Sequence, residues 1–208
     1  MKKILVVGGT GFIGVAITNK LKAKYFSFNV ISVGHSELDV TNLDSISKFY
    51  INNVNNEIFD GIIYSVGNCP PYGFIEEVKN PLLNLDPSKL NDDFDLHVTG
   101  LLRVIQMMKN NLSSSAKIVV ISSGITMVTD ETCPPTLFAG HYATVKSAQD
   151  ELVKWLNRDQ FFLKKGISVK SLKLRSIDTP FHWKEPVELK SPFMMSLDDA
   201  SEMILKEL

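Results

Sequence analysis

The sequence predicts an α/β fold, a doubly wound parallel sheet of about six to seven strands with helices on both faces in three layers. Short apolar runs alternate along the chain with longer segments of helical periodicity. The apolar runs are nearly continuous, which is typical of strands buried on both faces. The 208 residues fit a single domain, residues 1–208, and are enough to bury a substantial core.

The predicted elements follow one another in a regular order. The apolar runs that predict strands are residues 4–7, 28–33, 61–65, 117–121 and 168–174. The periodic segments that predict helices are residues 12–23, 43–53, 87–110, 140–164 and 197–208. Two stretches, 68–86 and 176–193, carry prolines and little periodicity, so they predict loops with at most one short helix.

Composition and charge argue against several classes of protein. The formal net charge of −1 gives no basic field of the kind that binds nucleic acid or a membrane surface. No apolar run approaches the roughly 18 residues of a membrane-spanning helix, and the apolar start breaks at Gly8, too soon for a signal peptide. The two cysteines, Cys69 and Cys133, form neither a metal-ligand spacing nor a disulfide framework. We therefore expect a cytoplasmic protein with no metal site.

A glycine-rich turn directly follows the first predicted strand. Residues 8–14 read Gly-Gly-Thr-Gly-Phe-Ile-Gly, so that Gly8, Gly11 and Gly14 recur at every third position before a helix. Glycine supplies the positive φ of a tight turn, and its missing side chain lets backbone N–H groups approach a pyrophosphate. The positive end of the following helix faces the same anion. The turn predicts a Rossmann-type dinucleotide site, and a glycine turn without a ligand is the alternative.

The end of the second predicted strand bears on the choice of cofactor. Its last residues carry neither the acidic side chain that binds the ribose hydroxyls of NAD nor an arginine for the 2′-phosphate of NADP. His35 and Ser36 could accept that phosphate, which favours NADP slightly over NAD, whereas Glu37 opposes it. Asp39 follows so closely that no crossover helix fits before it, and residues 39–42 also resemble a helix N-cap.

A tyrosine and a lysine share one helical face. Of the five tyrosines, only Tyr142 has a lysine, Lys146, four residues further on, and residues four apart project from the same side of a helix. A free tyrosine has a pKa of about 10, and a neighbouring ammonium favours the phenolate. Such a tyrosine can exchange a proton with an alkoxide at neutral pH. A surface helical pair is the alternative interpretation.

Serines close the strand that precedes this helix. Ser122 and Ser123 follow the apolar run 117–121, at the edge of an open α/β sheet where ligands bind. A serine hydroxyl there can donate to a substrate carbonyl and polarise it. Ordinary turn chemistry explains the same residues.

Together these motifs resemble the short-chain dehydrogenase/reductase family, specifically a compact branch of about 200 residues, over nearly the whole chain. The spacing of the glycine turn is similar to that of the extended and atypical branches, and the other matching segments come in the family's order. The resemblance implies cofactor contacts at Gly8, Thr10, Gly11, Phe12, Ile13, Gly14, His35, Ser36, Asp39, Val40, Ser65, Val66, Gly67, Tyr142, Lys146, Ile177 and Thr179.

The resemblance also implies an activity and partners. The chain would transfer a hydride between NAD(P) and a small carbonyl or alcohol substrate. Tyr142 would exchange the proton, Lys146 would tune it and bind ribose, and Ser123 would hold the substrate oxygen. The family commonly forms homodimers or homotetramers through the helices that match residues 87–110 and 140–164.

The sequence departs from the family at a few places. His97 stands where the family has a catalytic asparagine that supports a water in a proton relay, so His97 either takes part in the relay or packs in the core. The interval between Ser123 and Tyr142 is longer than usual, and the chain stops without the family's seventh strand. A non-catalytic dinucleotide sensor and a sugar-nucleotide epimerase-like enzyme remain alternative functions, although the short C-terminal segment argues against the epimerase.

Overall fold

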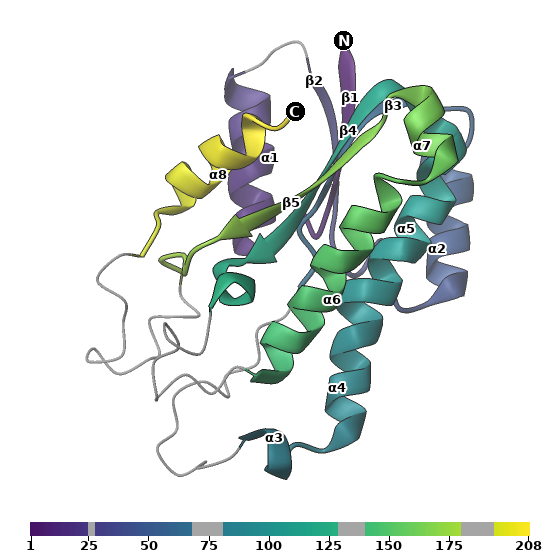
Figure 1. Ribbon diagram of the computed structural model, residues 1–208. Helices are drawn as coiled ribbons and strands as arrows, with labels where there is room; N and C mark the ends of the chain where they lie inside the picture. The colour runs from purple at the N-terminus through teal and green to yellow at the C-terminus, as the bar shows by residue number, and fades with distance from the viewer. Residues whose placement is uncertain (25–27, 68–80, 129–139, 180–193) are drawn as a thin grey trace.

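A five-stranded parallel sheet forms the centre of the described part of the chain (Figure 1). The computed structural model describes residues 1–24, 28–67, 81–128, 140–179 and 194–208. The strands are β1 (Lys2–Val7), β2 (Phe28–Val33), β3 (Phe59–Tyr64), β4 (Leu112–Ser123) and β5 (Ser168–Leu174). They are rich in β-branched residues, which favour extended backbone.

The strand order, β2-β1-β3-β4-β5, reverses direction at β1. From β1 the chain moves outward to β2 and then crosses back to β3 on the other side, so β1 pairs with both. In open α/β sheets ligands bind at such a switch point, beyond the carboxyl ends of the strands. The glycine turn after β1 and the segment Ser65–Gly67 after β3 meet there, because a Cβ on Gly8 would lie 2.6 Å from the Ser65 carbonyl oxygen.

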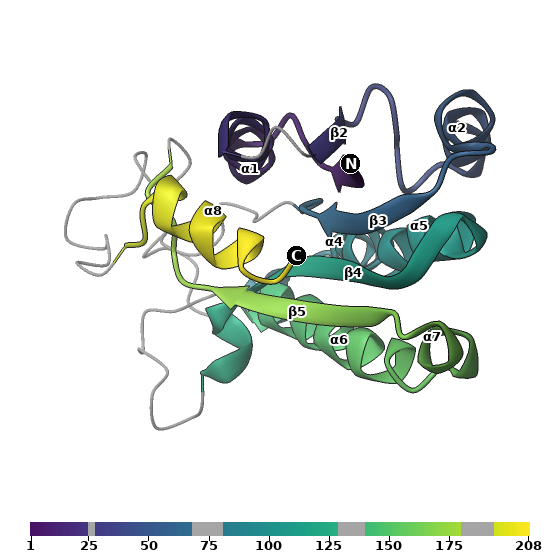
Figure 2. The ribbon, with the colours of Figure 1, turned by 90° about the horizontal axis from the view of Figure 1, so that it is seen from above.

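Helices cover both faces of the sheet (Figure 2). One face carries α1 (Phe12–Lys24) and α8 (Leu197–Leu205), and the other carries α2 (Leu43–Phe49), α5 (Gly100–Met108), α6 (Gly140–Leu156) and α7 (Gln160–Lys165). Successive side chains of a strand point to opposite faces of the sheet, so each strand contributes to two apolar clusters. Leu5 and Val7 belong to the cluster with α5 and α6, whereas Ile4 and Val6 belong to the cluster with α1 and α8. The remaining helical segments are α3 (Pro81–Asn84), α4 (Pro87–Phe94) and the short turns η1 (Tyr50–Val54), η2 (Asp95–Thr99), η3 (Lys109–Asn111) and η4 (Gly124–Met127).

The predicted fold class is confirmed, but the residues that the structure describes form five strands rather than the predicted six to seven. Residues 34–42 form a turn, in which Leu38 N–H donates to the Gly34 carbonyl, and Asn42 then caps α2. No helix lies between β2 and Asp39, as the sequence predicts. After β5 the described residues add only an isolated bridge between Ile177 and Met195. None of the helices in the described ranges combines the length and the apolar character that a membrane crossing needs.

The long predicted helices are interrupted. The segment 87–110 contains the π-helical turn η2, in which Gly100 N–H donates to the carbonyl five residues earlier, on Asp95. The segment 140–164 breaks after Leu156, because Asp159 caps the new helix α7 by accepting from Phe161 N–H.

Candidate active site

The glycine turn has little room for side chains at two of its glycines and open space at the third. Gly8 has a φ of +81°, and a Cβ on Gly14 would lie 2.2 Å from the Gly8 carbonyl oxygen, so the backbone itself requires both glycines. Gly11 differs, since a Cβ there would make only one ordinary contact, 3.5 Å from the Gly8 oxygen. The protein leaves the space at Gly11 open, which fits a pyrophosphate laid against the turn.

A hollow of about 220 Å³ lies over this turn at the ends of β1, β2 and β3. The predicted site residues that line it are Gly8, Thr10, Gly11, His35, Val40, Ser65, Val66 and Gly67. Gly34, Leu38 and Leu96 also line it and were not predicted. Phe12, Ile13, Gly14, Ser36 and Asp39 are not among its walls: Phe12 is exposed at the start of α1, and Ile13 packs on the core.

Carboxylates occupy the loop after β2. The Glu37 side chain turns back to accept from Gly34 N–H at 2.9 Å, and hydrogen bonds from Ser36 and Gly34 lower the pKa of its carboxyl group. Burial raises the pKa of Asp39, but hydrogen bonds from Thr41 outweigh it, so the net shift is downward. The His35 side chain is 82% exposed, with its Nδ1 3.8 Å from the Asp39 carboxylate. The loop thus offers a histidine and two anionic groups where a ribose would lie.

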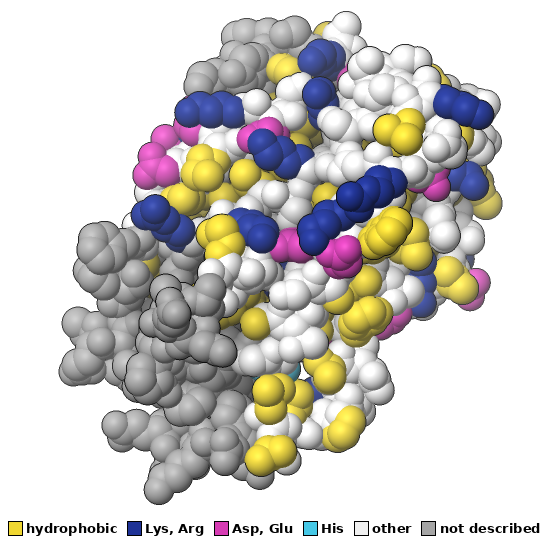
Figure 3. Space-filling view, viewed as in Figure 1, with side chains coloured by type: hydrophobic (Ala, Val, Ile, Leu, Met, Phe, Trp, Pro, Cys, Tyr) yellow, Lys and Arg dark blue, Asp and Glu magenta, His cyan; other side chains and the backbone are white. Residues whose placement is uncertain are grey.

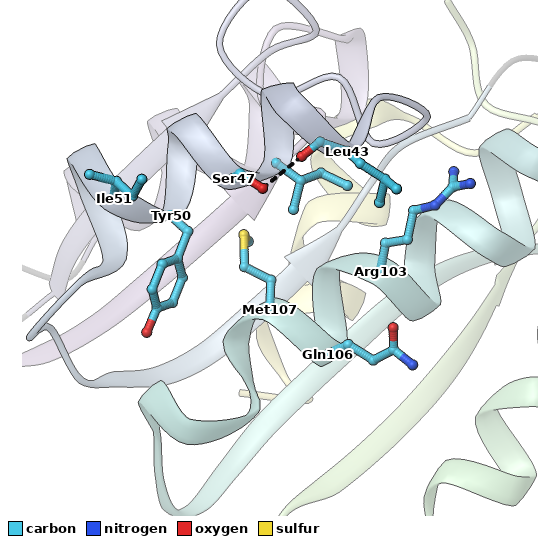
Figure 4. Close-up of a pocket in the computed structure, with 8 residues that line it drawn as sticks. Leu43, Ser47, Tyr50, Ile51, Arg103, Gln106 and Met107 are labelled. Atoms are coloured by element: carbon cyan, nitrogen blue, oxygen red, sulfur yellow. Dashed lines mark hydrogen bonds between the residues drawn. The ribbon is translucent and has the colours of Figure 1, made fainter.

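Arg103 on α5 is hydrogen-bonded to the backbone that follows this loop. Its guanidinium donates to the carbonyls of Val40 at 3.3 Å and Thr41 at 3.4 Å, and it pairs with Asp95 at 2.9 Å. The same side chain closes one end of a hollow of about 480 Å³ between α2 and α5 (Figure 4). The other residues that line this hollow are Leu43, Ile46, Ser47, Tyr50, Ile51, Gln106 and Met107, none of which was a predicted site residue.

Tyr142 and Lys146 project together from α6, as their spacing predicts. The Lys146 side chain is 3% exposed, and its Nζ lies 5.7 Å from the centre of the Tyr142 ring. The ammonium donates to the Ile121 carbonyl oxygen at 3.1 Å and to Gln149 Oε1 at 3.0 Å. A lysine buried this way is unlike the exposed helical pair that was the alternative interpretation.

His97 and Gly67 complete the surroundings of this pair. The His97 and Tyr142 rings pack edge to face with their centres 6.0 Å apart, and His97 is fully buried. A Cβ on Gly67 would lie 2.8 Å from His97 Cε1 and 3.7 Å from Lys146 Nζ. Glycine after β3 is therefore required for the cofactor-side loop to reach the tyrosine and lysine.

Ser123 ends β4 and reaches α6 through a chain of hydrogen bonds. Its Oγ accepts from Ile125 N–H at 3.3 Å and so caps η4. The Thr126 hydroxyl lies 3.1 Å from the Ser123 carbonyl oxygen and 2.9 Å from Asp150 Oδ2, and Asp150 also accepts from Ser171. The serine turn is thereby fixed to the helix that carries Tyr142.

The predicted nicotinamide contacts follow β5. Ile177 and Thr179 are both buried, and Ile177 packs in the apolar cluster of α1 and α8. The backbone of Met195 pairs with the residues on either side of Ile177. Asp178 N–H donates to the Met195 carbonyl, and Met195 N–H donates to the Ser176 carbonyl. Both predicted residues therefore follow the carboxyl end of β5, the neighbour of β4 in the sheet. Asn68 and Pro180, which follow the predicted contacts Gly67 and Thr179 in the sequence, lie outside the described residues.

Two polar residues of the site, Gln149 and Asp150, were missed by the sequence analysis. They stand three and four residues after Lys146, so helical periodicity places them on the same face of α6. That periodicity was the available signal, but only the folded neighbours show which of the helix's polar residues are buried.

Comparison with known proteins identifies the fold. No family model and no curated protein matches the sequence. Among solved structures, the protein lin1944 from Listeria innocua is similar over 100% of this chain and 94% of its own, with 17% identity and a TM-score of 0.78. A short chain dehydrogenase family protein from Francisella tularensis subsp. tularensis SCHU S4 has 20% identity over 100% and 91%, with a TM-score of 0.79.

A small-chain dehydrogenase in complex with NADPH is similar over 99% of this chain and 90% of its own, with 16% identity and a TM-score of 0.75. At these identities the likeness shows the fold alone, which is the one that the sequence motifs predict.

Proposed function

We propose that this chain, which has the short-chain dehydrogenase fold, is an NAD(P)-dependent oxidoreductase that transfers a hydride between its cofactor and a carbonyl or alcohol substrate. One observation carries the proposal: a buried lysine ammonium lies 5.7 Å from the ring centre of a tyrosine, at the sheet edge that also bears the glycine turn. A charge buried beside a titratable phenol is an arrangement for proton transfer.

The turn after β1 would hold the pyrophosphate, and the loop after β2, with Val40, would hold the adenosine end. Ser65, Val66 and Gly67 would face the middle of the dinucleotide, and Ile177 and Thr179 its nicotinamide end. The bound cofactor supplies the hydride chemistry. The structural neighbour that holds NADPH supports this assignment.

The chain's own residues would handle the proton and the substrate oxygen. Tyr142 gives its phenolic proton to the forming alkoxide, or takes the proton of an alcohol in the reverse direction. Lys146 stabilises the phenolate by its charge. Ser123 can donate its hydroxyl hydrogen to the same substrate oxygen while its Oγ accepts from Ile125. The substrate carbonyl is thus polarised from two sides.

NADP is the slightly favoured cofactor, through His35 and Ser36, and Glu37 is the residue that opposes it. The Glu37→Gln variant keeps the bond from Gly34 but removes a negative charge beside the ribose. We expect its affinity for NADP to rise relative to NAD, by roughly tenfold for a nearby charge. Fluorescence titration of both cofactors measures the ratio. If Glu37→Gln leaves the ratio of NADP affinity to NAD affinity unchanged, the 2′-phosphate does not lie at this loop. If the unaltered chain binds NAD more tightly than NADP, the predicted preference for NADP is wrong.

Turnover with a panel of aldehydes, ketones and alcohols tests the function. The Tyr142→Phe variant should lose about 10²- to 10⁴-fold in turnover while it still binds cofactor. Tyr50→Phe is the matched control, because it removes a phenol that donates to Asn111 and does not line the hollow over the glycine turn. Full activity of the Tyr142→Phe variant would refute the mechanism. Cofactor binding with no turnover on any substrate would favour the dinucleotide sensor.

A further inference from the structure

Ser123 is held at both its side chain and its backbone by η4, the turn that follows it. Its Oγ accepts from Ile125 N–H at 3.3 Å, and its carbonyl oxygen lies 3.1 Å from the Thr126 hydroxyl. An oxygen that accepts from Ile125 must present its own hydrogen in another direction. The direction in which the serine hydroxyl donates therefore depends on how η4 is fixed.

Thr126 joins this turn to α6. Its hydroxyl also lies 2.9 Å from Asp150 Oδ2, on the helix that carries Tyr142. A hydroxyl has one hydrogen, which either the Ser123 carbonyl or the Asp150 carboxylate can accept. The contact with Asp150 spans 24 positions of the sequence and connects two elements, so it can determine where the turn lies relative to the helix.

Asp150 is itself held by a third element, β5. The residue is buried, its Oδ1 accepts from the Ser171 hydroxyl, and its Oδ2 lies 3.3 Å from Lys173 Nζ. Burial raises the pKa of its carboxyl group, but the hydrogen bonds from Ser171 and Thr126 and the charge of Lys173 outweigh burial and lower the pKa overall. An ionised carboxylate accepts hydrogen bonds more strongly than a neutral oxygen does. Asp150 is therefore a fixed, charged acceptor between β5 and η4.

The helix α6 relates this acceptor to the proposed proton donor. Asp150 follows Tyr142 by about two turns, and a continuous helix holds the two residues in one rigid relation. The contact of Asp150 with Thr126 thus places the Ser123 turn relative to Tyr142. These are the two groups that the proposed mechanism brings to one substrate oxygen, and a displacement of about 1 Å at such groups can cost about 10²-fold in rate.

We infer that Thr126 and Asp150 are positioning residues, which hold the Ser123 hydroxyl at a fixed place relative to the Tyr142 phenol. The inference rests on the proposed function of those two groups. A contact that only ties a helix to a strand would stabilise the fold and nothing more. A positioning contact affects turnover as long as Ser123 has its hydroxyl, and ceases to affect it when that hydroxyl is removed.

The order of the turn can be measured without any substrate. The bond from Ile125 N–H to Ser123 Oγ slows exchange of the amide hydrogen with solvent, so the exchange rate measured by NMR reports how firmly the turn is held. Thr126→Val removes the hydroxyl at similar volume and should speed this exchange by roughly tenfold. Thr126→Ser keeps the hydroxyl and should leave the rate unchanged. Val119 N–H, in the buried part of β4, is the internal reference.

Turnover distinguishes positioning from stability. Ser123→Ala should lower turnover by roughly 10²-fold. Thr126→Val should lower it by roughly tenfold when Ser123 is intact, but by less than about twofold in the Ser123→Ala background. Asp150→Asn should follow the same pattern, with cofactor affinity unchanged throughout. Thr144→Val, which removes an exposed hydroxyl from the same helix, is the matched control and should keep full turnover.

Equal losses of turnover from Thr126→Val with and without the Ser123 hydroxyl would overturn the inference, and so would unchanged Ile125 exchange in both Thr126→Val and Asp150→Asn. If Thr126→Val does not fold, Asp150→Asn decides alone by both measurements. Failure of the proposed function gives a different pattern: Ile125 exchange speeds up as expected, yet Ser123→Ala and Tyr142→Phe retain full turnover. If no substrate is turned over, the Ile125 exchange decides whether these residues hold the turn.

Discussion

At the scale of single residues, the burial of Lys146 distinguishes the Tyr142–Lys146 pair from an ordinary pair on a helix surface. Lysine is rarely buried unless it is hydrogen-bonded, and Lys146 donates to the Ile121 carbonyl and to Gln149 Oε1 here. An exposed tyrosine and lysine at the same spacing would contribute only a few tenths of a kcal/mol to the helix. Burying this lysine therefore costs free energy that the small stabilisation of a helix by such a pair would not offset.

His97 is linked to the Tyr142–Lys146 pair through its backbone, by way of Gln149, and through its side chain. Its backbone carbonyl holds Gln149, and its imidazole packs on Tyr142, so a side-chain substitution leaves the bridge to Lys146 in place. If the imidazole takes part in the proton relay, His97→Leu should lower turnover by about 10- to 100-fold with little change in cofactor affinity. His97→Asn, which introduces the residue type of the family that the sequence resembles, should recover part of the loss.

Steady-state turnover and cofactor titration on the same preparations measure both quantities. Turnover of His97→Leu equal to that of the unaltered chain would leave the imidazole a packing residue only.

The residue scale also shows where sequence reasoning ends. The spacing of Tyr142 and Lys146 could be read directly, because a helix fixes the relation of residues four apart. The return of Glu37 to Gly34 and the orientation of Gln149 could not be predicted, because both depend on partners that only the tertiary fold brings near.

At the scale of elements, Asp150 joins α6 to β5 and η4. Burial raises its pKa, but hydrogen bonds from Ser171 and Thr126, with the charge of Lys173, outweigh that effect and lower it overall. A carboxyl group whose pKa is lower in the folded state stabilises the fold fully above its unfolded pKa. This contribution is lost as the pH falls through the folded pKa.

The Asp150→Asn variant should therefore be about 1–3 kcal/mol less stable at neutral pH, from the loss of charged hydrogen bonds. The difference should shrink as the pH falls below about 4, the ordinary pKa of an aspartate, because the unfolded chain then takes up a proton that the folded carboxylate does not yet bind. Urea unfolding at several pH values measures it. Glu151→Gln, the exposed neighbour on the same helix, serves as the control. A difference that stays constant down to acidic pH would contradict the assignment.

Arg103 links α5 to the loop that would hold adenine. Arg103→Met retains the length of the side chain in the hollow of Figure 4 but loses the bonds to the Val40 and Thr41 carbonyls. The loop should become less ordered, and we expect dinucleotide affinity to fall by roughly 3- to 10-fold. Gln106→Ala alters the same hollow without touching the loop and should bind normally. Equal affinities of the two variants would show that the loop needs no support from α5.

Element boundaries were predicted unevenly. The ends of β2 and β5 match the apolar runs, because a run bounded by turn residues defines a buried strand. The helix break at Asp159 was missed, although an aspartate followed by apolar residues is a capping signal. The π turn at η2 leaves no comparable signal, because the alternative pairing of its carbonyls depends on Tyr64 and Gln149.

For the whole molecule, alternation of apolar runs and periodic segments was enough to predict the parallel sheet and its two helical layers. The described residues form five strands, which are the five apolar runs of the sequence, whereas the predicted total of six to seven came from the family resemblance. Figure 3 shows lysine and arginine side chains spread over the surface that carries β5 and α6, interspersed with acidic and apolar ones, as the near-zero net charge leads one to expect.

Self-association is a prediction at this scale. The helices expected to pair subunits, α4 with α5 and α6, expose Phe94 and Trp155 to solvent in the single chain. We expect a homodimer or homotetramer, with two or four times the mass of one chain in sedimentation velocity. Phe94→Glu should shift the distribution toward the monomer, because a charge would be buried in the interface. A monomer at every concentration tested would contradict the expectation.

The central claim is that phenol, ammonium and serine hydroxyl converge on the reacting end of the cofactor. A crystal structure of the chain with NADPH tests it most directly. We expect the dinucleotide to lie over the turn at Gly11, with Lys146 Nζ at the nicotinamide ribose and the oxygens of Tyr142 and Ser123 facing one point beside the nicotinamide ring. A nicotinamide bound elsewhere, or a Tyr142 hydroxyl directed away from it, would contradict the account.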